Sequence, residues 1–511
     1  MKKSTLLIAM PLLASCALFP MTARAEWGTQ TEAKVFYTDA DSNGTTSMKA
    51  ARTDDGMTFV SWLAYPKTEG RGFNVYMLLL DQDGNSVWDE PLEVENKLNA
   101  SWTADYYLAA TPDGNALVCW ADARNSEGVE WPQEMTPVLY KVSRTGEQLW
   151  GEDGVTLDGT KYTYPPKPYV FGEEIYLVME SASETGAPEI TRLAEDGSFK
   201  IDPVTITGQL VQSVGTDFMA IYKTSDGTVA MRYNQDIEKV WDEPALISDQ
   251  LYGGYDRNPY TCVSDGQGGA FITFLRPLGL FGSLPIVQYI SADGEPVFGE
   301  AADVLVTEDD IHAYTVMGVN TETEKVMTAW QISGGRAAIG GQMMDYFGER
   351  LWGDDGRNLA EKVEESGYTF GPMAIHPVAA DRWCLVYADE LGWATNQGYI
   401  ALYNDNGEAI GVEKFGGVTD ITSPKVYFVD DSCIIIYLAS ETDDDWNTTV
   451  TLNSVKIDNI SQISGVNGIQ ADNTAKPEYF SIDGMRLAQP RQGLNIVRKS
   501  DGTVSKVMIS K

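Results

Sequence analysis

The stretch that decides the fold is Leu80-Asp81-Gln82-Asp83-Gly84-Asn85-Ser86-Val87-Trp88, because its pattern recurs along the 511-residue chain. A turn containing glycine is followed, four residues after the glycine, by a large aromatic side chain. An Asp-Gly pair supplies the positive φ of a tight hairpin, and the next strand then buries its aromatic between neighbouring layers. Further copies of the unit are Gly146 with Trp150, Gly294 with Phe298, Gly348 with Trp352 and, in weaker form, Gly197 with Ile201, Ile237 with Trp241, and Gly407 with Ile410.

A second repeated element is a short apolar run bounded by Gly, Asp and Asn. Such runs are typical of buried strands. The eight runs are Phe59–Trp62, Leu117–Trp120, Ile175–Val178, Phe218–Tyr222, Phe271–Phe274, Val326–Trp330, Leu385–Tyr387 and Ile434–Tyr437. The repeat averages about 55 residues, in the range of propeller blades of four short strands. The sequence therefore predicts an all-β protein, a β-propeller.

The N-terminus carries the aromatic unit that the last repeat lacks. Trp27-Gly28 opens the repetitive region, and no copy follows Tyr437. A strand from the N-terminus that completes the last blade would close the ring and remove two sheet edges. We therefore expect eight blades, with Trp27 in the outermost strand of the blade that contains Cys433. Seven blades is the alternative, because residues 166–245 hold two short, degenerate repeats.

The Leu-Asp-x-x-Gly-x-x-x-Trp element resembles the repeat of quinoprotein-type propellers, which are commonly eight-bladed. The resemblance extends over most of residues 27–458 and implies the fold rather than an activity. The adjacent Cys-Cys pair of the quinoprotein enzymes is absent from the sequence, and so is a haem-attachment motif.

Composition excludes one class of partner. The net charge is −37, from 37 Lys and Arg against 74 Asp and Glu. Such a surface repels phosphate backbones, so we expect no nucleic-acid binding. The 43% hydrophobic and 11% aromatic content is enough for a packed core.

Residues 1–25 have the pattern of a signal peptide. Lys2 and Lys3 precede an apolar stretch, and Ala23-Arg24-Ala25 offers a cleavage site. The alternative is lipoprotein processing, because Leu13-Ala14-Ser15-Cys16 resembles a lipobox. No later segment has the roughly 18 apolar residues of a membrane span. We expect an extracytoplasmic protein that is secreted or displayed on the outer-membrane surface.

The C-terminal composition indicates a separate module. Residues 26–458 form the predicted propeller, 459–476 a linker rich in Asn, Ser, Gly and Ala, and 477–511 a small β module. The pattern Tyr479 to Arg486, followed by Gly493 to Arg498, resembles the C-terminal sorting module of type IX secretion in Bacteroidetes. The resemblance implies secretion machinery as a partner.

Chemically reactive residues are few. Cys119, Cys384 and Cys433 lie inside apolar strands of separate repeats, which favours free buried thiols over disulfides. His312 and His376 are the only histidines, and neither stands near a nucleophile motif. Histidine-based catalysis is therefore not expected.

Two candidate sites remain. Polar residues just beyond the apolar strands would gather on one face of the ring, where propellers commonly bind ligands. These residues are Asp122, Arg124, Glu180, Lys223, Arg276, Gln331, Asp389, Glu390 and Glu441. Separately, Asp39, Asp41 and Asn43 match the opening of a Ca²⁺ loop, but Ala50 stands where the bidentate Glu is needed. A polar turn between strands is favoured for that segment, so no cofactor is predicted and Ca²⁺ is the alternative.

Two function classes fit these observations. The first is a secreted or cell-surface binding protein for a glycan or a protein, without catalysis. The alternative is a carboxylate-dependent glycoside hydrolase or lyase on a propeller scaffold, which needs two carboxylates at a defined separation.

Overall fold

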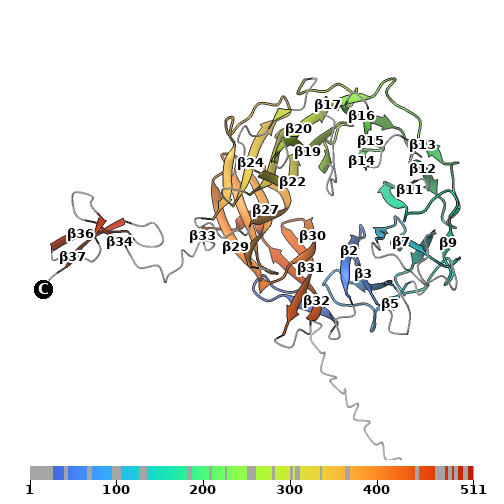
Figure 1. Ribbon diagram of the computed structural model, residues 1–511, viewed down its shortest axis with the longest axis horizontal. Coiled ribbons are helices and arrows are strands. Elements are labelled where there is room, and N and C mark those ends of the chain that lie inside the picture. Colours follow the sequence, from blue (N-terminus) through green and yellow to red (C-terminus); the bar gives the residue numbers. More distant parts are fainter. Residues whose placement is uncertain are drawn as a thin grey trace, which may run out of the picture.

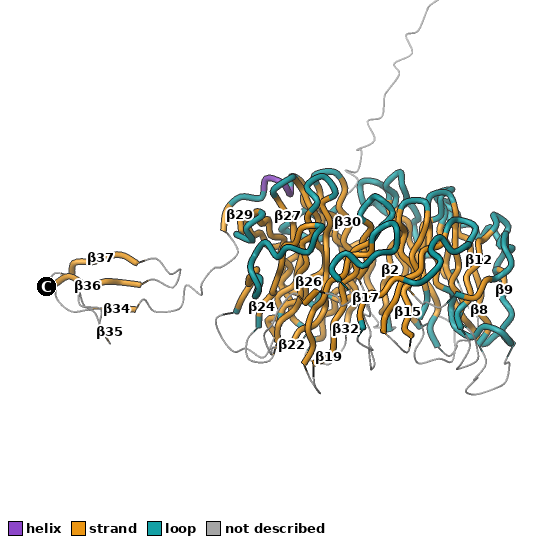
Figure 2. The backbone as a smooth tube through the Cα atoms, turned by 90° about the horizontal axis from the view of Figure 1, so that it is seen from above, coloured by secondary structure: helices purple, strands orange, loops and turns teal. Residues whose placement is uncertain are grey.

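The chain forms a closed ring of eight four-stranded antiparallel blades in the computed structural model (Figure 1). The structure describes the following residues: 27–39, 44–65, 72–94, 105–125, 135–180, 187–206, 210–224, 227–249, 261–278, 282–299, 303–304, 311–333, 337–362, 369–392, 394–443, 448–466, 478–480, 486–487, 493–498 and 504–509. Within each blade the first strand lies nearest the centre and the fourth at the rim (Figure 1). From the side, the ring is a broad disc with loops on both faces (Figure 2). The prediction of eight blades is confirmed.

The four strands of each blade follow one another in the chain, except in blade 8. The inner strands are β2 Thr46–Arg52, β6 Tyr107–Ala110, β10 Lys167–Phe171, β14 Leu210–Val214, β18 Thr261–Ser264, β22 Ile311–Asn320, β26 Phe370–Ala379 and β30 Thr422–Val429. The second strands are β3 Thr58–Ala64, β7 Ala116–Asp122, β11 Glu174–Met179, β15 Asp217–Thr224, β19 Ala270–Leu278, β23 Lys325–Ser333, β27 Arg382–Gly392 and β31 Ser432–Thr442. The third strands are β4 Asn74–Leu80, β8 Thr136–Val142, β12 Glu189–Leu193, β16 Gly227–Tyr233, β20 Gly282–Ile290, β24 Ala338–Asp345, β28 Thr395–Asn404 and β32 Thr448–Asp458. The outer strands are β5 Leu92–Glu93, β9 Val155–Thr156, β13 Val204–Thr205, β17 Ala245–Ser248, β21 Asp303–Val304, β25 Arg357–Glu361, β29 Ala409–Thr419 and, for blade 8, β1 Lys34–Asp39.

The second strands contain the eight apolar runs that the sequence predicted. They read as continuous hydrophobic stretches because a strand in mid-blade packs on a neighbouring blade through each of its faces. Every residue of β3 and β7 is buried. Residues 166–245, whose degenerate repeats made seven blades the alternative prediction, form two complete blades, β10 to β13 and β14 to β17.

The N-terminal strand closes the ring as expected. β1 pairs antiparallel with β32, so blade 8 joins the two ends of the repetitive region. The prediction that Trp27 belongs to the outermost strand is wrong, since β1 begins only at Lys34. Trp27 instead reaches over to blade 1, where its indole packs on Gly84. The Trp27 side chain packs at the junction between blades 8 and 1, and this contact does not require its backbone to lie in a strand.

The repeated turn joins each blade to the next. Gly84, Gly146, Gly294 and Gly348 have φ between 78° and 88°, which confirms the predicted positive φ. The aromatic of the preceding blade packs on each of these glycines. Where it is tryptophan, its indole N–H donates to the carbonyl two residues before the glycine, which we call the seam carbonyl. The five bonds, 2.6–3.0 Å long, run from Trp27 to Gln82, Trp88 to Arg144, Trp150 to Glu195, Trp241 to Ala292 and Trp352 to Asp405.

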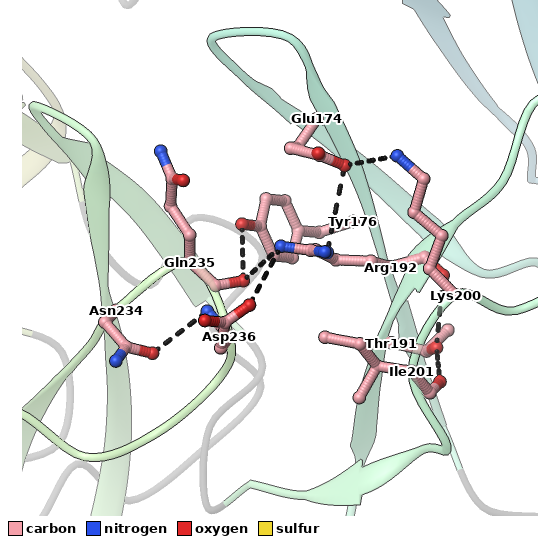
Figure 3. Close-up of polar contacts among 9 residues, drawn as sticks. All are labelled: Glu174, Tyr176, Thr191, Arg192, Lys200, Ile201, Asn234, Gln235 and Asp236. Carbon is pink, nitrogen blue, oxygen red and sulfur yellow. Dashed lines mark hydrogen bonds and ion pairs between the residues drawn. The ribbon is translucent and has the colours of Figure 1, made fainter.

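The seam between blades 3 and 4 keeps this bond with different donors (Figure 3). Ile201 stands where the tryptophan is missing, and Ile237 replaces the turn glycine with a φ of 63°. The seam carbonyl of Gln235 accepts hydrogen bonds from the Tyr176 hydroxyl at 2.9 Å and from Nη1 of Arg192 at 3.1 Å. The carbonyl is therefore satisfied without an indole, which explains how a degenerate repeat still forms a regular blade.

The chain continues to pack on the ring after β32. A 3₁₀ turn, Ile460–Gln462, leads to β33, Gly465–Val466, which pairs parallel with β29. These residues fall within the range predicted as linker. The last described strands form a separate four-stranded sheet: β34 Glu478–Phe480, β35 Arg486–Leu487, β36 Gly493–Arg498 and β37 Val504–Ile509. Among the described residues, no helix has the length and hydropathy that a membrane span requires.

Candidate functional site

The inner strands of blades 8, 1, 2 and 3 bring charged and aromatic side chains together near the centre of the ring. We call this set the inner arc. Its members, on or beside these strands, are Lys425, Lys49, Asp105, Tyr107, Lys167 and Glu180.

Lys49 on β2 connects blade 1 with blade 2. Its Nζ lies 3.0 Å from Oδ1 of Asp105 and 5.3 Å from the ring centroid of Tyr107. The side chains of Lys49 and Asp105 are 26% and 56% exposed. An ion pair this open to solvent contributes about 0–1 kcal/mol to stability. Both charged groups are therefore accessible to a ligand at little cost to the fold.

Lys167 on β10 repeats this arrangement on the other side of Tyr107. Its Nζ lies 3.0 Å from Oε1 of Glu180 and 5.9 Å from the Tyr107 ring centroid. Burial raises the pKa of the Tyr107 hydroxyl, and the charges of Asp105 and Glu180 raise that pKa further. Tyr107 is thus protonated at neutral pH and available as a hydrogen-bond donor.

Lys425 on β30 extends the arc into blade 8. The side chain is half-buried, and this burial lowers its pKa, with a further lowering from the charge of Lys49. Within the part of the chain that the structure describes, no carboxylate forms an ion pair with the Lys425 ammonium group. The charge of Lys49, on the inner strand of the adjacent blade, acts on Lys425, and among the described residues the ion-pair partner of Asp105 is Lys49.

A pocket opens beside the arc, between the ends of β2, β6 and β10. Its lining residues are Arg52, Thr53, Asp54, Ala110, Thr111, Pro112, Val170 and Gly172. Arg52, three residues after Lys49 and therefore on the opposite face of β2, donates from Nη1 to the Thr58 hydroxyl at 3.1 Å. Burial lowers the pKa of Arg52. A third cation thus borders a space that the described side chains leave open.

Sequence analysis singled out Glu180 but missed the other members of the arc. The available signal was a repeated tetrapeptide, Thr46-Ser47-Met48-Lys49 and Thr422-Ser423-Pro424-Lys425. Each copy lies just ahead of an apolar strand, and therefore on an inner strand. The predicted rim residues follow the apolar strands, whereas Lys49 and Lys425 precede them.

Asp122 and Arg124, which were candidate ligand-binding residues, form an internal pair in blade 2. Arg124 donates from Nε and Nη2 to both carboxylate oxygens of Asp122, at 2.8 and 2.7 Å. Nη2 also donates to the Tyr140 hydroxyl, and Nη1 to the carbonyl of Asp153. Asp122 is fully buried. The pair fastens the strand end and its loop to the blade.

Gln331, Asp389 and Glu390 meet at the junction of blades 6 and 7. Gln331 donates to the Thr369 hydroxyl, which itself donates to Glu390 Oε2 at 3.2 Å. Lys362 lies 2.7 Å from Oδ1 of Asp389, and burial raises the pKa of that carboxyl. Each of the three therefore has a partner within the fold at this junction, Thr369 for Gln331 and Glu390, and Lys362 for Asp389.

The remaining predicted rim residues are dispersed. Lys223 belongs to β15 in blade 4, Arg276 to β19 in blade 5, and Glu441 to the end of β31, where it is exposed. Of the nine predicted residues, only Glu180 contacts the inner arc within the described part of the chain.

The candidate Ca²⁺ loop lies mostly outside the described residues, because these omit Asp41 and Asn43. Asp39 is buried and accepts a 2.6 Å hydrogen bond from the Thr45 hydroxyl. The described residues contain no group of three or more metal-ligating side chains.

The histidines and cysteines occupy structural positions. His312 is buried with Nδ1 2.6 Å from the carbonyl of Ser283, and the His376 ring stacks on Phe428. Cys119, Cys384 and Cys433 are buried free thiols, as predicted. Burial raises the pKa of each thiol, so they are poor nucleophiles.

Comparison with known proteins adds no family. No protein-family model matches the sequence, and no curated protein matches it. A protein of unknown function from Dyadobacter fermentans DSM 18053 is 12% identical, with a TM-score of 0.36 over 83% of this chain and 98% of its own. The polysaccharide lyase Uly1 is 11% identical, with a TM-score of 0.42 over 85% and 94%.

A third solved structure is the α-L-arabinanase of Penicillium chrysogenum, which was complexed with arabinobiose. It is 9% identical, with a TM-score of 0.33 over 85% of this chain and 99% of its own. At such low TM-scores and identities, none of the three transfers an activity to this chain. The eight-bladed arrangement rests on the chain's own strand pairing.

Proposed function

We propose that this chain is a secreted or cell-surface binding protein that holds a glycan against the inner arc, without catalysis. The observation that supports it best is the order of groups across blades 1 to 3, in which Tyr107 stands between the Lys49–Asp105 and Lys167–Glu180 pairs. Ammonium donors and carboxylate acceptors alternate there on rigid strands. Sugar hydroxyls both donate and accept hydrogen bonds, so this alternation suits a hydroxyl-rich ligand.

The state of Tyr107 favours binding over lyase chemistry at this site. A tyrosine that abstracts a proton works best with a pKa near the operating pH. The pKa of Tyr107 is raised, which moves it away from that range. The two carboxylates that a hydrolase would need are each engaged by a lysine, Asp105 by Lys49 and Glu180 by Lys167.

The test is titration calorimetry of the purified protein with a panel of soluble oligosaccharides, neutral and acidic. We expect Tyr107→Ala and Lys49→Met each to weaken binding at least about ten-fold, the loss typical of one charged hydrogen bond. Incubation of the same panel with the protein should release no new reducing ends and no unsaturated products.

A matched control lies toward the rim of blade 3. Lys161 pairs with Glu189 at 2.7 Å and lies 5.1 Å from the Tyr162 ring centroid, so it reproduces the Lys49 environment. Lys161 and Tyr162 border a separate hollow together with Leu157 and Phe199. If Lys161→Met weakens binding and Lys49→Met does not, the ligand belongs to that hollow and the proposed site is wrong. Binding of proteins but of no glycan would reject the glycan proposal.

The export signals belong to the same proposal. Cleavage after Ala25 and a sorting role for residues 477–511 would place the protein outside the cell, where extracellular glycans are met. Removal of residues 477–511 should shift the protein from the surface or medium to the periplasm. If the shortened protein still reaches the surface, lipid attachment at Cys16 becomes the better explanation of its location.

A further inference from the structure

The two Thr-Ser-x-Lys segments adopt the same irregular backbone in adjacent blades. In β2 the pairing register shifts between Thr46 and Lys49, and in β30 it shifts between Thr422 and Lys425. Such a bulge re-aims the side chains that follow it.

The serine of each segment has a left-handed backbone, with a φ of 54° at Ser47 and 50° at Ser423. This conformation costs about 1–3 kcal/mol for a residue other than glycine, and persists only where its surroundings demand it. Blade 6 has the same bulge, with a register shift between Ala313 and Val316 and a φ of 47° at Tyr314. There Val316 stands where the other two segments have lysine, so the bulge belongs to the fold and the two lysines distinguish blades 8 and 1.

Three cations lie on the strands that carry these two lysine-bearing segments. Lys49, Arg52 and Lys425 lie on two adjacent inner strands, although the whole chain carries a net charge of −37. Arg52 donates to the Thr58 hydroxyl, and Lys49 pairs with Asp105. Placing cations in a partly desolvated position is unfavourable unless an anion accompanies them. The lowered pKa of Lys425, caused by burial and then by Lys49, shows this penalty.

We infer that the ligand of the inner arc is anionic, and that Lys49 and Lys425 together hold a carboxylate or sulfate group of an acidic polysaccharide. This inference rests on the proposed glycan binding and specifies its substrate class. The anion would supply the negative charge that the described residues do not give Lys425. The pairs around Tyr107 would meanwhile bind the hydroxyls of the adjoining sugar units.

The test compares three probes by calorimetry at low salt: an oligouronate, a sulfated oligosaccharide and a neutral oligosaccharide of equal length. We expect at least about ten-fold tighter binding of one acidic probe than of the neutral one, a preference that falls as salt screens the charges. If the oligouronate binds more tightly than the sulfated oligosaccharide, the group held is a carboxylate, and if the sulfated probe binds more tightly, it is a sulfate.

Variants of Lys425 decide the inference. Lys425→Met should remove most of the acidic preference, measured as the ratio of the acidic to the neutral affinity, and Lys425→Arg should retain it. Lys161→Met, which changes a lysine outside the arc, should leave this ratio unchanged. Melting temperatures of all variants verify that each is folded.

The outcomes separate this inference from the proposed function. Equal affinity for acidic and neutral probes, or an acidic preference that survives Lys425→Met, overturns the anionic site and leaves glycan binding in place. Failure of every glycan to bind overturns both.

Discussion

The seam turns and the inner arc show two opposite uses of one repeat. At five seams an indole makes the same bond, and at the seam between blades 3 and 4, where the tryptophan is missing, Tyr176 and Arg192 replace it as donors (Figure 3). At the inner strands the repeat is broken. Blades 8 and 1 carry a bulge followed by a lysine, whereas blade 6 has the same bulge with Val316 in the place of the lysine.

This contrast teaches where to look for function in a repeat protein. Uniform contacts hold identical units together, so each repeated position is accounted for by stability. A ligand is asymmetric and needs different groups from different blades. Departures from the repeat in side-chain chemistry, such as Lys49 and Lys425 where blade 6 has Val316, are therefore stronger pointers to a site than the repeat itself.

The largest expected effect comes from opening the ring. Deletion of residues 26–46 removes β1, which pairs with β32, and removes Trp27 from the Gly84 turn. Two sheet edges become exposed, and we expect a loss of more than about 4 kcal/mol in the free energy of unfolding, beyond the usual effect of a point mutation. Thermal unfolding followed by circular dichroism measures it.

The control for this deletion is removal of residues 477–511, which should leave the melting temperature nearly unchanged. An unaltered melting transition in the N-terminal deletion would show that closure contributes little. Misfolding of the C-terminal deletion would show instead that the tail belongs to the core.

A smaller loss is expected from Gly348→Val. Gly348 has a φ of 88°, and a Cβ there would lie 2.9 Å from Cδ1 of Phe298. Backbone strain and the clash with the Phe298 ring both destabilise the variant, so its free energy of unfolding should fall by more than about 1 kcal/mol. Urea unfolding of Gly151→Val separates the two causes, because Gly151 has a φ of 81° with no atom within 4 Å of an added Cβ. Equal costs at the two positions would mean that aromatic packing on the turn is unimportant.

The seam bond itself is tested by Trp88→Phe, which leaves the Arg144 carbonyl without its indole donor. We expect a cost of about 1 kcal/mol, the net worth of one hydrogen bond. Tyr176→Phe should cost less, since Arg192 still donates to the Gln235 carbonyl. Urea unfolding of both variants compares the two seams, and a larger loss in Tyr176→Phe would contradict the substitution of donors.

The smallest effect is expected from Lys425→Met. The pKa of Lys425 is lowered in the folded protein, so the unfolded chain binds its proton more tightly. Between the lowered pKa and the ordinary value of about 10.4, stability contributed by this group therefore rises with pH. Lys425→Met should keep the stability at pH 7 within about 0.5 kcal/mol of the parent, or increase it, and should abolish that rise.

The measurement is the free energy of unfolding of Lys425→Met and of the parent protein between neutral pH and pH 10. A large loss of stability in Lys425→Met would show that the lysine has a structural partner, and would remove it from the proposed anion site.

Sequence reasoning went furthest where a local pattern dictates local structure. The turn glycines, the buried second strands, the free thiols and the closing N-terminal strand follow from hairpin chemistry and from the removal of sheet edges. It went wrong at Trp27, because the periodic signal locates the aromatic in the chain but does not say whether its backbone lies in a strand.

The candidate site was the harder problem. Asp122, Gln331 and Asp389 were chosen for their positions after the apolar strands, and the structure pairs them with Arg124, Thr369 and Lys362. A polar residue at a strand end is equally able to fasten a loop or face a ligand. Only the position of its nearest partner distinguishes the two.

The sequence by itself determined that the chain is built from repeated four-stranded sheets, that the N-terminus completes the last blade and that the fold is a propeller. These features depend on spacings of a few residues, which are visible in one dimension. The tertiary structure alone decided that Lys425, Lys49, Tyr107 and Lys167 are neighbours. They belong to four blades, and Lys425 lies at the far end of the chain from Lys49. Closure of the ring brings them together, because it makes the last blade adjacent to the first.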